Sequence, residues 1–362
     1  MGIDEEKVII RTSDRLTFKR CRQQWDFGSK IRQNWEPLIR PLPLDFGVAI
    51  HAGLQEYYEP DFWTGDRSMI QLVAKEVFRD LCRVHRNDYL EAMHVDDMDP
   101  QIEQEQYYEP MELGLGMLDH YFQWAPTVDN FQPKLVEIEF EVPIPGPNGR
   151  DLYWHGMPVV YQGRVDLLVE DQFGRYWIVD HKTAAQFGSV EYLEMDEQCG
   201  SYIWALKKML NLPIAGVIYN RLLKAVPKGP VPLQRGGFSV NKQQRTTYEV
   251  FKKGLLEAGE NPSHYIDFLE YLQDQGNKFF QRIQVSRSST EINNLERQIG
   301  LEAIDMLNDP SIYPSVGMFN CMGCAYRPPC LAKLDGSDYG FILNETFRKR
   351  PQAEEVLVDD GT

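Results

Sequence analysis

The sequence has no long apolar run and no secretory leader. No stretch of about 18 apolar residues occurs, which predicts that no helix crosses a membrane, and the opening MGIDEEK lacks a basic segment followed by an apolar one. Internal repeats and low-complexity tracts are also missing. The chain has six cysteines, and in a cytosolic protein thiols stay reduced, so that clustered cysteines more often bind metal than pair as disulfides. We therefore expect a cytoplasmic protein with no membrane partner, built as two domains or one elaborated domain.

Basic residues are in deficit, which by itself argues against a protein that coats nucleic acid. The chain has 38 Lys and Arg against 54 Asp and Glu, a formal charge of −16. The deficit is uneven, because residues 7–40 contain nine Lys and Arg against three acids, and residues 205–255 contain ten against one. Aromatic residues that could stack on unpaired bases accompany these basic segments: Trp25, Trp35, Tyr219 and Phe238. We predict local basic tracks on an acidic body.

Hydrophobic periodicity predicts a mixed α/β protein. Helical spacing dominates the first 130 residues, and period-two patterns with β-branched residues then predict strands. A helix and a buried strand follow, and the chain reads as helical again from about residue 242 to 307. The expected core strands cover residues 134–143, 159–169, 175–182 and 214–219, with a helix over 190–210.

Two aspartates and a lysine lie at matching positions of the second and third expected strands. Asp166 and Asp180 fall on the two strands of one hairpin, and the period of two puts Asp180 and Lys182 on the same face. Two carboxylates bind Mg²⁺ or Mn²⁺ through oxygen, and a nearby ammonium offsets charge on a phosphate. The spacing alone is equally compatible with an ion pair at a strand end.

Three late cysteines form a C-x2-C-x5-C pattern at Cys321, Cys324 and Cys330. Tetrahedral coordination by sulfur needs a fourth thiolate, and the candidates are Cys21, Cys82 and Cys199. Thiolates by themselves do not choose between zinc and an iron–sulfur cluster.

The residues around the aspartates resemble the PD-(D/E)xK nuclease superfamily in its RecB-like form. The matching motifs are Gly163-x-x-Asp166 and Ile178-Val-Asp-His-Lys-Thr183, together with a Q-x-x-x-Y element, Gln198 to Tyr202, and a G-x-x-x-H element, Gly47 to His51. The resemblance implies a restriction-endonuclease-like mixed β-sheet core flanked by helices. It makes Lys182 catalytic and implies a Mg²⁺ or Mn²⁺ site formed by His51, Asp166, Asp180 and the backbone carbonyl of His181. The side chain of His181 is expected to point outward.

The segment around Cys21 resembles the start of AddB-type and CRISPR-associated RecB-like nucleases, although Arg22 replaces a frequent proline. In those proteins one early and three late cysteines hold a 4Fe-4S cluster. The resemblance thus implies a cluster on Cys21, Cys321, Cys324 and Cys330 that joins the two ends of a helical frame, with Zn²⁺ as the alternative occupant. The expected regions are an N-terminal helical region 1–130, a nuclease core 131–240, a C-terminal helical region 241–335 and an acidic tail 336–362.

The implied activity is metal-dependent hydrolysis of DNA phosphodiesters by an exonuclease that takes single strands or DNA ends, in recombination, repair or end processing. Expected substrate contacts are Gln198, Tyr202, Arg221 and Lys224. Two alternatives stay open, namely a structure-selective endonuclease of the same fold and an inactive DNA-binding module with a structural zinc. The sequence lacks a Walker A motif, so any helicase partner would be a separate chain.

Overall fold

A computed structural model describes residues 7–39, 42–308 and 310–350 of the chain. In this part of the chain a seven-stranded mixed sheet runs in the order β1-β5-β6-β7-β8, with β3 and β4 both pairing β5. The strands are β1 (Val8–Arg11), β3 (Phe131–Pro143), β4 (Tyr153–Trp154), β5 (Met157–Asp171), β6 (Tyr176–Ala184), β7 (Ile214–Leu223) and β8 (Phe280–Ser286). The expectation of a mixed sheet flanked by helices is confirmed.

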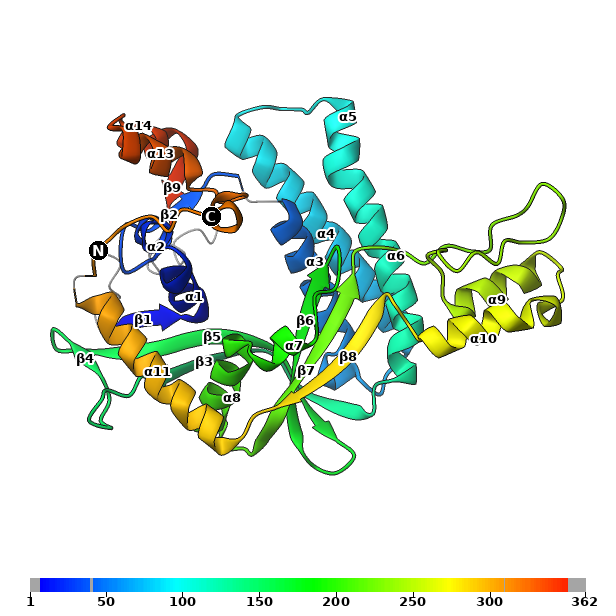
Figure 1. Ribbon diagram of the computed structural model, residues 1–362, viewed down its shortest axis with the longest axis horizontal. Coiled ribbons are helices and arrows are strands. Elements are labelled where there is room, and N and C mark those ends of the chain that lie inside the picture. Colours follow the sequence, from blue (N-terminus) through cyan, green and yellow to red (C-terminus); the bar gives the residue numbers. More distant parts are fainter. Residues whose placement is uncertain (1–6, 40–41, 309, 351–362) are drawn as a thin grey trace, which may run out of the picture.

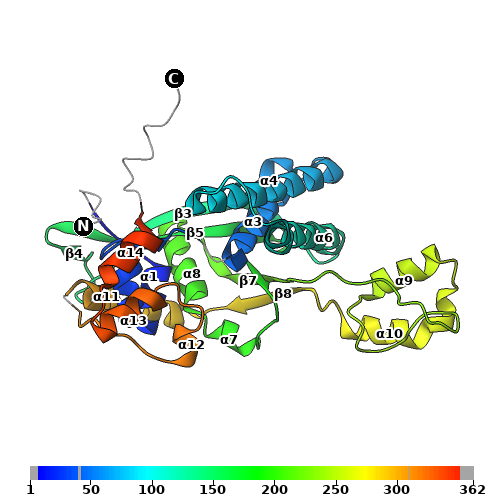
Figure 2. The same cartoon turned by 90° about the horizontal axis from the view of Figure 1, so that it is seen from above.

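Period-two alternation divides the sheet residues between two hydrophobic cores. Ile178 and Val217 pack into the core formed with α8 (Glu197–Leu210) and α11 (Ser289–Leu307). The neighbouring residues Val179 and Ile218 pack into the core formed with α3 (Leu42–Tyr57), α4 (Arg67–Met93) and α6 (Glu109–Trp124). Figures 1 and 2 show these two groups of helices on opposite faces of the sheet. Both faces of the central strands are therefore buried.

A small helical lobe separates β7 from β8. It consists of α9 (Tyr248–Glu257) and α10 (Ile266–Gln275), which pack on each other through a core of their own that contains Phe251, Leu255 and Phe268. Figure 1 shows the lobe projecting beyond the edge of the sheet. The prediction of continuous helix from 242 to 307 was wrong at β8, whose seven residues complete an antiparallel pair with β7.

The two ends of the described chain lie side by side. β2 (Trp35–Pro37) pairs with β9 (Phe347–Lys349) in a second, two-stranded sheet. Phe27 from α2 (Arg22–Gly28) packs with Tyr326, Leu343 and Phe347. The segment predicted as an acidic tail thus includes α14 (Tyr339–Thr346) and β9, whereas its residues 351–362 lie outside the described part of the chain.

The remaining α-helices of the described chain are short. They are α1 (Thr12–Arg20), α5 (Pro100–Glu103), α7 (Glu191–Glu194), α12 (Met318–Cys321) and α13 (Arg327–Asp335). Among the described residues, no helix combines the length and apolar character needed to cross a membrane.

Candidate active site

The two aspartates meet where β5 and β6 pair. The antiparallel register sets Leu167 opposite Val179, so the next position along brings Asp166 beside Asp180. The backbone N–H of His181 donates a hydrogen bond of 2.7 Å to Asp166 Oδ2. The hairpin itself therefore brings the two carboxylates together.

Lys182 is held between Asp180 and the helix that follows its strand. Its Nζ lies 3.0 Å from Asp180 Oδ2 and donates a hydrogen bond of 2.8 Å to Gln198 Oε1. The amide of Gln198 then donates to the Tyr202 hydroxyl over 2.8 Å, one helical turn along α8. The fixed chain Asp180–Lys182–Gln198–Tyr202 orients the ammonium toward the aspartates.

The two carboxylates differ in acidity. Burial would raise the pKa of Asp166, but the hydrogen bond and charge of His51, with the His181 N–H, outweigh burial and lower it. Burial raises the pKa of Asp180 above its usual value despite the opposing charge of Lys182, and the charge of Asp166 adds to the increase. Positive charge close to Asp180 therefore stabilises its ionised form, as Lys182 does here.

His51 and His181 flank Asp166 in different ways. His51, on α3, places its Nδ1 3.4 Å from Asp166 Oδ2. The prediction that His181 points outward was wrong, because this residue is only 3% exposed and its Nδ1 accepts a 2.6 Å hydrogen bond from the Asn220 amide. Burial lowers the pKa of His181 to about 3, so the ring is neutral. A neutral imidazole faces the core and leaves only the backbone of this residue at the site.

A buried polar network behind His181 has no counterpart in the sequence analysis. Arg282 on β8 forms a 2.7 Å ion pair with Asp129, whose side chain is 1% exposed, and it also donates to Asn220. The hydroxyls of Tyr58, which directly follows α3, and of Tyr121 on α6 complete the network. The network ties α6, β7 and β8 to His181 on β6, the strand that carries Asp180. No local spacing signalled it, because Asp129 and Arg282 are 153 positions apart.

Glu137 is a third carboxylate near the aspartates that the sequence analysis missed. It pairs with Arg164 at 2.7 Å and has a positive φ of 47°, which is uncommon for a residue other than glycine. Burial raises the pKa of Glu137, the charge of Arg164 opposes this, and the charge of Asp166 adds to the increase.

The basic and aromatic residues predicted to contact a substrate differ in how accessible their side chains are. Arg221 is only 6% exposed and donates a 2.8 Å hydrogen bond to the carbonyl of Gly188, which leaves little of its guanidinium for a ligand. Lys224 lies with its Nζ 4.9 Å from the ring centre of Phe46. The prediction that Trp25 and Tyr219 stack on bases was wrong, because each is 1% exposed and packs inside the core.

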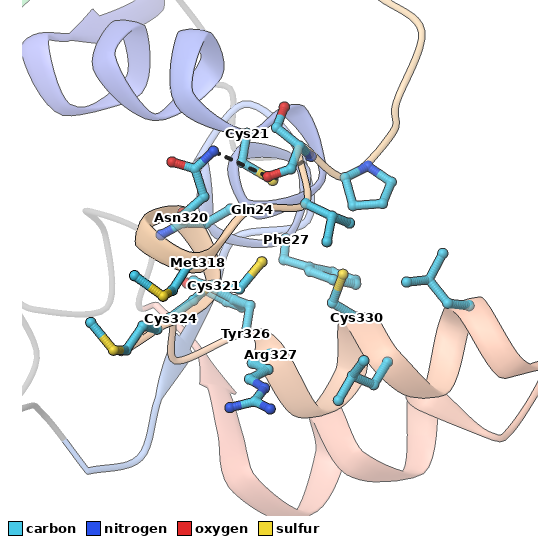
Figure 3. Close-up of a pocket in the computed structure, with 16 residues that line it drawn as sticks. Cys21, Gln24, Phe27, Met318, Asn320, Cys321, Cys324, Tyr326, Arg327 and Cys330 are labelled. Atoms are coloured by element: carbon cyan, nitrogen blue, oxygen red, sulfur yellow. Dashed lines mark hydrogen bonds between the residues drawn. The ribbon is translucent and has the colours of Figure 1, made fainter.

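Four cysteines from distant parts of the chain line one largely apolar cavity of about 440 Å³. Cys21 precedes α2, Cys321 ends α12, Cys324 follows in the next turn, and Cys330 lies on α13. Figure 3 shows the four side chains around this space. The other two cysteines are separate, since Cys199 belongs to the core beside α8 and Cys82 packs against the core beside α4.

The aspartate site and the cysteine cavity each gather donor atoms that metals use, although not yet in a metal-binding arrangement. Among the described residues, no group of three or more His, Cys, Asp or Glu side chains is arranged so that it could hold an ion as it stands. At the aspartates, however, Asp180 Oδ2 is buried, and its charged contact is the Lys182 ammonium at 3.0 Å. Hard carboxylate oxygens beside a histidine suit Mg²⁺ or Mn²⁺, and four thiols around one cavity suit iron–sulfur or zinc. In chemical type both donor sets fit.

Comparison with known proteins identifies the family. The model of the PD-(D/E)XK nuclease superfamily matches residues 13–331. No curated relative matches the chain. Among solved structures the chain is similar to the protein SSO0001, with 14% sequence identity and a TM-score of 0.30. The match covers 64% of this chain and 80% of that one. Because the family match extends over most of the chain and includes every element around Asp166 and Lys182, the chain belongs to the PD-(D/E)XK nuclease superfamily.

Proposed function

We propose that this chain is a metal-dependent DNA exonuclease that hydrolyses phosphodiesters in single strands or at DNA ends, in recombination, repair or end processing. One observation carries the proposal. The Asp166 carboxylate and the buried Asp180 carboxylate meet on one hairpin, directly beside a lysine that Gln198 and Tyr202 hold in place. A strand-end ion pair needs one carboxylate for one lysine, whereas two carboxylates with His51 beside them offer the oxygen and nitrogen ligands of a divalent metal site.

The residues divide the work of hydrolysis. Asp166 and Asp180 would hold Mg²⁺ or Mn²⁺, with His51 and the His181 carbonyl completing the site. The ion, when bound, lowers the pKa of a water and offsets phosphate charge. The Asp180 carboxylate outweighs the effect of burial and raises the pKa of Lys182, so its ammonium stays charged beside the phosphate. Lys182 thereby stabilises negative charge that develops as water attacks.

The choice of DNA strands or ends rests on the RecB-like motifs. Gln198 and Tyr202 stand one turn apart on α8 and border the lysine, which suits contacts to the strand being cut. Lys224 directly follows β7 and lies beside Phe46 of α3. This position suits contact with a phosphate of the bound DNA strand other than the one being cut. A structure-selective endonuclease would use the same residues, so the form of the substrate separates the two.

Metal and strand dependence test this function. We expect release of labelled nucleotides from linear single-stranded DNA with Mn²⁺, and loss of release when a chelator removes the metal. Strands labelled at the 5′ or the 3′ end report the direction of digestion. A closed single-stranded circle should stay intact, and its cleavage would instead establish the endonuclease.

We further propose that Cys21, Cys321, Cys324 and Cys330 hold a 4Fe-4S cluster that staples the two ends of the chain together. The support is that α2 and β2 already contact the C-terminal elements around the cysteine cavity. Burial raises the pKa of Cys324 and Cys330, and the neighbouring thiols add to the increase. A bound metal would reverse this shift by stabilising the thiolates.

Spectroscopy and metal analysis test the cluster. Anaerobically purified protein should absorb at about 400 nm and contain about four irons per chain. Replacement of Cys21 by Ser should remove most of the absorbance, whereas Cys82→Ser, in a cysteine away from the cavity, should leave it unchanged. Colourless protein with one zinc per chain would establish the zinc alternative.

A further inference from the structure

A second cavity, which is polar, borders α1 and α2 and has no role in the function proposed above. It has a volume of about 400 Å³ and is lined by residues of α1, α2 and the last described residues of the chain. Three cationic side chains from separate segments line it: Arg11, Lys30 and Arg350. Such a gathering of one charge in a concave site attracts anions.

The three cations are not equally satisfied within the protein. Arg11 donates a 2.5 Å hydrogen bond to Gln162, and Arg350 pairs with Glu36 at 3.1 Å. Lys30 makes no side-chain hydrogen bond or ion pair with any residue of the described ranges. Burial lowers the pKa of Lys30, and repulsion from Arg11 and Arg350 adds to the decrease. The charges of Asp14 and Glu36 oppose this decrease, but neither acid forms an ion pair with the Lys30 ammonium in the described part of the chain.

Further donors surround this ammonium. Trp25 lines the cavity, and its indole N–H is buried without a hydrogen-bond acceptor among the described residues. The hydroxyl residues Ser13 and Thr17 line the cavity one helical turn apart on α1. The one lining carboxylate, Asp14, is 9% exposed and already accepts hydrogen bonds from Ser29 Oγ and the Arg11 N–H. Donors and positive charge in excess of acceptors match a phosphate group.

We propose that this cavity is a phosphate subsite for the DNA strand, separate from the scissile phosphate. Arg11 is bonded to Gln162, four residues before Asp166 on β5, which corresponds to about 13 Å of strand. That separation suits a backbone phosphate away from the bond being cut. The assignment of the ligand to DNA rests on the proposed function, whereas the binding of phosphate does not.

Charge removal at Lys30 tests the subsite on the anaerobically purified full chain. Binding of a fluorescent single-stranded oligonucleotide is measured without divalent metal over a series of salt concentrations. We expect Lys30→Gln to weaken binding about 3- to 10-fold and to reduce the slope of log affinity against log salt by about 0.7, the value for one phosphate contact on a single strand. Lys134→Gln is the matched control, because Lys134 pairs with Glu170 outside both basic segments. An affinity and slope equal to those of the control would overturn the proposal.

Inorganic phosphate separates the subsite from the nuclease activity. At constant ionic strength, phosphate should raise the Tm of the unsubstituted protein and not that of Lys30→Gln. Without phosphate, Lys30→Gln should have the higher Tm, because it relieves repulsion among the three cations. Stabilisation by phosphate through Lys30 with unchanged DNA binding would overturn the assignment to a DNA strand. A chain that cuts no DNA but shows both Lys30 effects would refute the nuclease proposal and leave the subsite standing.

Discussion

Replacement of Lys182 by Ala should lower the rate of DNA hydrolysis about 10²- to 10³-fold, the effect of removing one preorganised charge from a transition state. The Lys182 ammonium contacts both Asp180 and Gln198, so its loss removes a fixed positive charge from the place proposed for the scissile phosphate. The measurement is initial release of nucleotide from single-stranded DNA with Mn²⁺. Equal rates for the variant and the unsubstituted protein would refute the enzyme function and favour an inactive DNA-binding module.

Lys182→Ala should also change how the free energy of unfolding depends on pH, because it leaves the Asp180 carboxylate without its cation. Lys182→Ala leaves Asp180 buried without its cation, which we expect to cost about 1–3 kcal/mol at neutral pH. Because the pKa of Asp180 is already raised in the folded state, protonation in mild acid removes that charge, and the cost should shrink as the pH falls. Asp180→Asn is the companion variant, and it should abolish hydrolysis with a Tm at or above that of the unsubstituted protein. A cost that does not change with pH would contradict this account of Asp180.

Replacement of Arg282 by Met should destabilise the fold by about 3–5 kcal/mol, because it leaves the Asp129 charge buried and unpaired. Asp129 has 1% side-chain exposure, and Arg282 also donates to the two tyrosine hydroxyls behind His181. The measurement is denaturant unfolding followed by fluorescence. The double variant Arg282→Met/Asp129→Leu should recover most of the loss, since it removes both charges together.

An exposed pair supplies the control for this prediction. Lys75 and Asp119 lie 2.8 Å apart with side-chain exposures of 24% and 52%, and Lys75→Met should cost less than about 1 kcal/mol. If Arg282→Met costs no more than Lys75→Met, the network does not hold the strand. The recovered double variant should still hydrolyse DNA about tenfold more slowly, because His181 loses the support that reaches it through Asn220.

Much of the fold was predictable because its signals are local. The alternation that buries Ile178 on one face and Val179 on the other is visible within one strand, and the strands β3, β5, β6 and β7 were all anticipated. β8 was missed because it sits between helices and its Gln-Arg-Ile-Gln sequence alternates weakly. Only pairing with β7 makes it a strand.

The sequence by itself determined the elements of chemistry that lie close together along the chain. The period of the strands and one hairpin predict that Asp166, Asp180 and Lys182 lie together. One helical turn predicts the pair Gln198 and Tyr202, and spacing alone picks out the three late cysteines. The tertiary structure alone decided which distant groups meet. The tertiary packing buries Trp25 and Tyr219 in the core. It also directs the His181 side chain toward the Arg282 network, through Asn220. Around one cavity it brings together three cations, Arg11, Lys30 and Arg350. The physical reason is that periodicity reports which face a residue occupies, whereas desolvation and pairing depend on neighbours supplied by other segments.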